Sequence, residues 1–94
     1  MSDEIEKTET FPIVNELGLH ARAAIKLAQT AGKFGCEVTI SRDGQEANAK
    51  SVMGLLLLCG AKGTRITVSA KGDRADDAVA AIGVLVANRF GEAQ

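Results

Sequence analysis

Residues 36–41 alternate apolar and polar side chains without a break, which is the pattern of a strand with one buried face. Asp43-Gly44 follows, a dipeptide typical of a tight hairpin turn, so residues 45–49 are predicted to return antiparallel. Residues 65–70 alternate in the same way. A sheet made of such strands has one face in water and one face that other elements must cover.

Three helices are available to cover that face. The first is predicted over residues 21–31, the second from an N-cap at Ser51 through residue 58, and the third over 75–90 with Asp73 as its cap. The first and third helices each carry an apolar stripe, formed by Ala24, Leu27, Ala28 and Ala31 in one and by Val79, Ile82, Val86 and Phe90 in the other. These stripes predict helices that pack on the sheet.

A fourth strand is predicted over residues 11–15, where Pro12 favours a sheet edge. The element order is then βαββαβα, which predicts a two-layer, open-faced α/β sandwich. Residues 1–9 are charged and polar and are expected to form a flexible leader, and residues 10–94 to form one domain. The core is expected to be aliphatic, because only 3% of the residues are aromatic.

Composition argues against several classes of function. Few aromatic residues and a net charge of −1 argue against a binder of nucleic acid or of an anionic membrane. The apolar runs are too short to cross a bilayer, and the acidic start is unlike a signal peptide. Cys36 and Cys59 are too few for a disulfide framework or a cysteine zinc site. We therefore expect a reduced cytosolic protein without metal or cofactor.

His20 is the single histidine of the chain and lies just before the first predicted helix. A lone histidine at such a position is ordinarily a surface cap. Three details favour a chemical role: the positive end of the helix dipole disfavours an imidazolium, the free N–H groups of the first turn form an anion site, and Arg22 is able to bind phosphate oxygens bidentately. A neutral nitrogen nucleophile with these donors is suited to a transient phosphohistidine.

Residues 52–58 contain six apolar residues in seven, too many for one face of a short helix. Such a helix is either buried all round or leaves an apolar surface exposed. In a two-layer domain of this size the exposed surface is favoured, and Met53 suits an adaptable docking surface.

The residues Gly18-Leu19-His20-Ala21-Arg22, the run Lys50-Ser51-Val52-Met53-Gly54 and the later Ala61-Lys62-Gly63 resemble, in order and spacing, the HPr family of histidine-containing phosphocarrier proteins. The resemblance covers residues 10–90. It implies a four-stranded antiparallel sheet covered on one face by three helices. It also implies a carrier, rather than an enzyme, that accepts a phosphoryl group from enzyme I and passes it to an enzyme IIA domain of the phosphotransferase system.

By resemblance, His20 is the phosphoryl acceptor through Nδ1 and Arg22 stabilises the phosphate. Ser51 matches a serine that a kinase phosphorylates in some lineages, where a phosphorylase removes the phosphate again. Both partners are expected to dock on one apolar surface of a monomer, formed by Ala21, Ile25, Val52, Met53 and Leu56.

Two positions depart from the common family pattern. Ala23 stands where proline is usual, which predicts a softer helix start with intact transfer. Leu17 stands where sugar-transport members often have a small polar residue, and the surrounding segment looks closer to the nitrogen-related NPr branch. Two other functions stay open: a regulatory module that binds partners through residues 52–58 without transferring phosphate, and a small-ligand sensor.

Overall fold

The computed structural model describes residues 6–58 and 60–94. The elements in chain order are β1 (Glu6–Pro12), α1 (Ala21–Gly32), β2 (Glu37–Arg42), β3 (Gln45–Asn48), α2 (Val52–Leu57), β4 (Arg65–Lys71), α3 (Ala75–Ala87) and a 3₁₀ turn, η1 (Arg89–Gly91). The predicted order βαββαβα is confirmed.

The four strands form one sheet in the order β1-β4-β2-β3, and every neighbouring pair is antiparallel. The hairpin between β2 and β3 turns at Asp43 and Gly44, whose φ angles of 50° and 83° are those of a tight hairpin turn. One face of the sheet is polar: Thr10 and Thr67 share a hydrogen bond of 3.0 Å across β1 and β4. This is the open face of the predicted sandwich.

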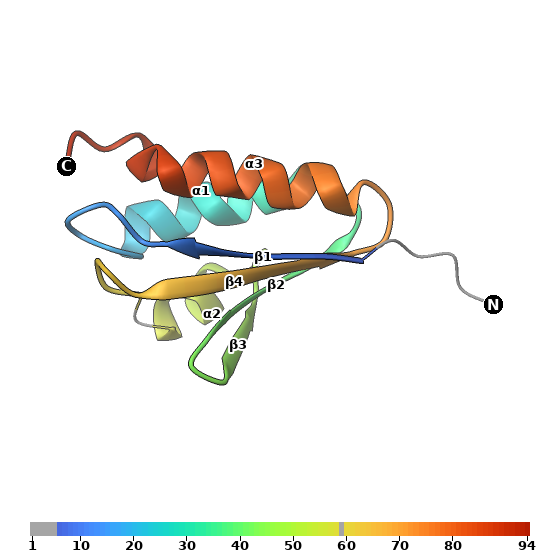
Figure 1. The fold of residues 1–94 in the computed structure, drawn as a ribbon, viewed down its shortest axis with the longest axis horizontal. Helices are drawn as coiled ribbons and strands as arrows, with labels where there is room; N and C mark the ends of the chain where they lie inside the picture. Colours follow the sequence, from blue (N-terminus) through green and yellow to red (C-terminus); the bar gives the residue numbers. More distant parts are fainter. Residues whose placement is uncertain (1–5, 59) are drawn as a thin grey trace.

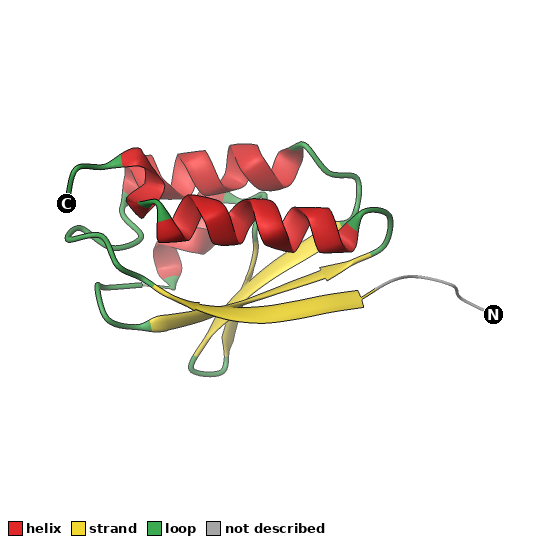
Figure 2. Cartoon of the chain, turned by 45° about the horizontal axis from the view of Figure 1, so that its top comes forward, coloured by secondary structure: helices red, strands yellow, loops and turns green. Residues whose placement is uncertain are grey.

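The helices cover the other face (Figures 1 and 2). Helix α3 packs on β1 and β4, α1 packs on α2 and α3, and α2 lies against β3. The largest fully buried apolar side chains are almost all aliphatic: Ile13, Leu27, Ile40, Leu55, Leu58, Ile66, Val68, Val79, Ile82 and Val86, with Phe90 as the exception. The predicted aliphatic core is confirmed. Of the predicted stripe, Val79, Ile82 and Val86 are buried on α3, whereas Phe90 is buried in η1, beyond the end of that helix.

The first strand lies earlier in the chain than its predicted bounds of 11–15. Residues 6–9, expected in a flexible leader, pair with β4, while residues 1–5 lie outside the described residues. The alternation that marks a half-buried strand is absent, because β1 is an edge strand whose residues from Glu6 to Thr10 are all exposed. Pro12 ends this edge strand, as its missing N–H predicts.

The ends of the last helix also differ from the prediction. Its N-cap is Arg74, with a left-handed φ of 59°, and not Asp73. The helix stops at Ala87 because the chain turns sharply: Arg89, Phe90 and Gly91 all have positive φ. Phe90 is nevertheless fully buried, so the turn redirects the backbone while its side chain stays in the core. No helix within residues 6–58 and 60–94 has the length and apolarity that a membrane span requires.

Candidate functional site

A tight turn at Gly18 positions the segment that leads into α1. Gly18 has a φ of 66°, and a Cβ atom built on it would lie 2.4 Å from the carbonyl oxygen of Gly60. The next residue, Leu19, is buried and donates its backbone N–H to that same carbonyl over 2.7 Å. Only glycine fits this approach, and the turn fixes where the next side chain, that of His20, leaves the backbone.

His20 is the N-cap of α1. Its backbone is extended, with φ −84° and ψ −178°, and its carbonyl accepts the first helical hydrogen bond from Ala24 over 2.8 Å. Its Nδ1 atom faces the backbone N–H of Arg22 at 3.3 Å. The side chain is 24% exposed, so the ring is accessible from one side. His20 is thus a helix cap, and its Nδ1 atom lies at the N–H groups where an anion would bind.

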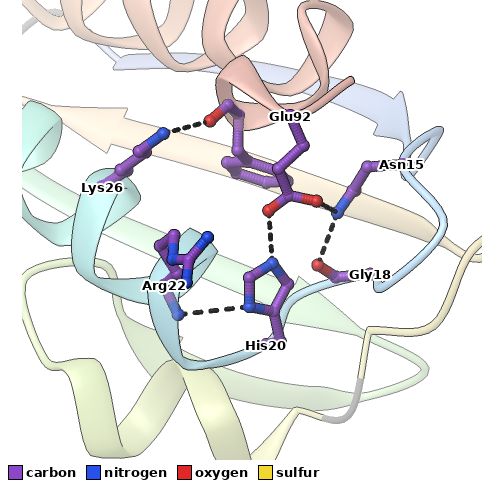
Figure 3. A network of polar contacts seen from close by, with 7 residues as sticks. Asn15, Gly18, His20, Arg22, Lys26 and Glu92 are labelled. Carbon is purple, nitrogen blue, oxygen red and sulfur yellow. Dashed lines mark hydrogen bonds and ion pairs between the residues drawn. The ribbon is translucent and has the colours of Figure 1, made fainter. Parts of the chain in front are cut away.

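The other ring nitrogen, Nε2, contacts the Oε2 atom of Glu92, 72 residues later in the chain (Figure 3). The second oxygen of that carboxylate, Oε1, accepts a hydrogen bond of 3.0 Å from Nδ2 of Asn15. The same Nδ2 donates to the carbonyl of Gly18 over 2.9 Å. Asn15 is fully buried, so this network joins the histidine, the Gly18 turn and the C-terminal segment around a buried amide.

The network also sets the charge of Glu92. Burial raises the pKa of its carboxyl group, but the hydrogen bonds from Asn15 and His20, with the positive charge of Lys26, outweigh burial and lower that pKa below its usual range. The Glu92 side chain is only 13% exposed, so these contacts act with little screening by solvent. Glu92 is therefore a carboxylate at neutral pH.

The C-terminal segment is held in place at two further points. Nζ of Lys26 on α1 donates a hydrogen bond of 2.6 Å to the carbonyl of Phe90. The backbone N–H of Glu16 donates to the carbonyl of Gln94 over 3.0 Å. In Figure 1 the end of the chain and the loop after β1 accordingly lie at the same end of the sandwich.

A hollow of about 290 Å³ opens beside Glu92. Arg22 lines it together with Leu17, whose side chain is 69% exposed. The other lining residues are Glu16, Ala93 and Gln94. Across this hollow Arg22 faces the C-terminal segment that carries Glu92.

The predicted docking residues are at least partly accessible. Met53 is 71% exposed and Ile25 is 45% exposed, Ala21 is exposed, and Val52 and Leu56 are half-buried. Leu57, which was not singled out, is 74% exposed. An all-round buried α2 is therefore wrong, and the exposed apolar surface is confirmed. Its use as a docking site stays a prediction.

Ser51 is the N-cap of α2, as predicted. Its Oγ accepts a hydrogen bond of 3.1 Å from the backbone N–H of Gly54. The helix runs only to Leu57, one residue short of the predicted end. Ala23, in place of the usual proline, lies fully buried in the first turn of α1, and that helix starts at Ala21 with its cap in place.

Sequence reasoning missed Asn15 and Glu92. Asn15 stands in a segment predicted to be strand, where an asparagine gives no sign of burial. Glu92 follows the predicted end of the last helix and looks like a solvated terminal residue. The one available signal was Gly91, because a glycine after a helix marks a change of chain direction. Within the described residues, no three His, Cys, Asp or Glu side chains group as metal ligands would.

The chain matches a family model described as "PTS HPr component phosphorylation site" over residues 7–88. The phosphocarrier protein HPr of Cupriavidus necator is 45% identical over 82 residues, covering 87% of this chain and 92% of that one. The phosphocarrier protein NPr of Shewanella violacea is 51% identical over 81 residues, covering 86% and 89%. The crystal structure of HPr-C-His from Thermoanaerobacter tengcongensis superposes with a TM-score of 0.90 at 39% identity, covering 94% and 99%.

Proposed function

This chain belongs to the HPr family of phosphocarrier proteins of the phosphotransferase system, and we propose that it carries a phosphoryl group on Nδ1 of His20. In this proposal phospho-enzyme I donates the group and an enzyme IIA domain receives it. The chain acts as a monomer in the cytoplasm and needs no cofactor.

The observation that carries the proposal is the orientation of the imidazole ring. Nδ1 lies at the N-terminus of α1, 3.3 Å from the backbone nitrogen of Arg22. A phosphoryl group bound there would meet free N–H groups and the positive end of the helix dipole. The N–H of Arg22 faces the lone pair of Nδ1, so that nitrogen is the one available as a nucleophile.

The transfer itself is a displacement at phosphorus. The lone pair of Nδ1 forms the new N–P bond while the bond from phosphorus to its donor atom on enzyme I breaks, and that electron pair stays with the donor. Delivery is a second displacement, in which an acceptor atom of the enzyme IIA domain bonds to phosphorus while the N–P bond breaks and its electron pair returns to Nδ1. Arg22, which is exposed and lies in the first turn of α1 two residues after His20, contributes a guanidinium fork for the phosphoryl oxygens in both steps.

Both partners are proposed to dock on the apolar surface of Ala21, Ile25, Val52, Met53 and Leu56. Helices α1 and α2 pack against each other, so the elements that carry these side chains are neighbours. A carrier must release each partner quickly, which favours a small interface of this kind.

Incubation with phosphoenolpyruvate and enzyme I tests the function. The expected product carries one phosphate, which acid removes and alkali does not, and it loses that phosphate when an enzyme IIA domain is added. A protein that binds enzyme I yet incorporates no phosphate would instead be the regulatory module that acts through residues 52–58.

A further inference from the structure

Glu92 is the one carboxylate that touches the ring of His20 within the described part of the chain. It lies after η1, beyond residues 7–88 that the family model matches. The side chain is nearly buried and both of its oxygens have partners, one on His20 and one on Asn15. A carboxylate held this way acts on the ring through a fixed hydrogen bond.

That contact determines which ring nitrogen carries the proton. An ionised carboxylate only accepts hydrogen bonds, so Nε2 of His20 must be the donor. Nδ1 faces a backbone N–H, which only donates, so Nδ1 must present its lone pair. The two neighbours thus demand the same tautomer, with hydrogen on Nε2 and the lone pair on Nδ1.

Asn15 fixes the carboxylate in turn. Its Nδ2 donates to Oε1 of Glu92 over 3.0 Å and to the carbonyl of Gly18 over 2.9 Å. Both partners are acceptors, so the amide must point its NH₂ group toward them. Since Gly18 stands two residues before His20, Asn15 ties Glu92 to the turn that positions the ring.

We propose that Glu92 is a positioning residue which keeps the proton on Nε2 of His20 through the whole phosphoryl cycle, and that Asn15 holds Glu92 in place. The proposal rests on the proposed function of His20. When Nδ1 bonds to phosphorus the ring keeps its Nε2 proton and becomes cationic, and the Glu92 carboxylate pairs with that charge. When the N–P bond breaks, its electrons return to Nδ1 and the neutral ring is restored. No proton enters or leaves the imidazole in either direction.

The charges around Glu92 are consistent with this role. Its pKa is lowered, so it stays ionised at neutral pH, and Lys26 and Arg22 of α1 lie on its side of the molecule. Glu16 lines the same hollow but is exposed and paired with Lys62, 2.7 Å away. Glu16 therefore provides a matched control: a carboxylate near the site that does not touch the ring.

The first test is ¹⁵N NMR of the unphosphorylated protein, which reads the tautomer without any phosphoryl donor. The wild type is expected to show hydrogen on Nε2. In Glu92→Gln the amide is able to accept from or donate to Nε2, so only the N–H of Arg22 still selects this tautomer and a measurable fraction with hydrogen on Nδ1 is expected. A wild-type ring with hydrogen on Nδ1 would overturn the proposal. This result is decisive even if the Glu92→Gln variant does not fold.

The second test is the rate of phosphoryl transfer from enzyme I. Glu92→Gln is expected to slow transfer by roughly 10–100-fold, by analogy with the loss of a carboxylate that orients a metal-bound histidine. Glu92→Asp should recover part of the rate, and Glu16→Gln should transfer as the wild type does. Wild-type rates in Glu92→Gln would overturn the positioning role while leaving His20 as the carrier. Absence of transfer in the wild type would instead refute the proposed function.

Discussion

The ammonium group of Lys26 donates a hydrogen bond of 2.6 Å to the backbone carbonyl of Phe90. This bond joins α1 to the turn in which three successive residues take left-handed backbone angles. The ring of Phe90 is fully buried beneath that turn. Side-chain packing and one charged hydrogen bond together determine where the chain leaves α3, and therefore where Glu92 meets His20.

Replacing Lys26 with methionine keeps the aliphatic stem and removes the donor. We expect the free energy of unfolding to fall by about 1 kcal/mol, the typical net value of one hydrogen bond. Denaturant unfolding measures it. Lys33→Met is the control, because Lys33 is exposed and its side chain makes no hydrogen bond within the described residues. Equal stability of both variants would show that the Lys26 bond contributes nothing.

His20→Ala should abolish phosphorylation by enzyme I. It should also cost about 0.5–2 kcal/mol of stability, because the cap of α1 is lost. His20→Asn separates the two effects, since asparagine is a good N-cap but offers no ring nitrogen. Phosphate incorporation and thermal melts decide the matter. Incorporation at the wild-type rate in either variant would rule out His20 as the acceptor.

Arg22 should contribute to transfer more than to stability, because its side chain is exposed. Loss of an electrostatic contact to the transferring group typically costs ~10²–10³ in rate, and we expect this for Arg22→Ala. Arg22→Lys should recover only part, because an ammonium lacks the guanidinium fork. Rapid-quench measurements of transfer from enzyme I give the rates. Full activity of Arg22→Ala would mean that the helix terminus alone binds the phosphoryl group.

Met53→Glu should weaken binding to both enzyme I and the enzyme IIA domain. We expect roughly a tenfold rise in Kd, or about 1.4 kcal/mol, for a charge placed in an apolar contact. Val84→Glu is the matched control: Val84 on α3 is 69% exposed and Met53 is 71% exposed. Calorimetric titration gives Kd and a thermal melt gives Tm. A large loss of Tm with normal binding would place Met53 in the core and not in an interface.

Local patterns predicted those elements that bury one face. In the strand at 36–41 and in the stripe on α3, the spacing of the apolar residues indicates which face is buried. The Asp43-Gly44 turn was predictable because its two residues must take left-handed backbone angles, which Asp and Gly tolerate. Residues 6–9 were not predicted as strand, because all four side chains are exposed and their sequence therefore has no apolar period.

Only those residues of the candidate site that lie close together in the sequence could be predicted. His20 and Arg22 are two residues apart, and the helix start brings them together. Asn15 and Glu92 are 77 residues apart, and their hydrogen bond depends on how α3 packs and how η1 turns. No spacing rule connects such positions, so the histidine was identified without the carboxylate that orients it.

Ser51 combines a structural role with a proposed regulatory one, and two variants separate them. Its Oγ caps α2 through Gly54, so Ser51→Ala should keep transfer and lose roughly 1 kcal/mol of stability. A phosphate or carboxylate at the same place meets the positive end of the helix, so Ser51→Asp should remain folded.

A negative charge at Ser51 is expected to weaken the docking of partners. A phosphoserine adds about −1.5 to −2 charges beside the half-buried Val52 and the exposed Met53, where an incoming partner must exclude water. Ser51→Asp is therefore expected to slow transfer from enzyme I to His20 while its melting temperature stays close to that of the wild type. Steady-state transfer assays beside thermal melts measure both effects. If Ser51→Asp transfers phosphate at the wild-type rate, Ser51 is a helix cap alone, because phosphorylation there would not regulate docking.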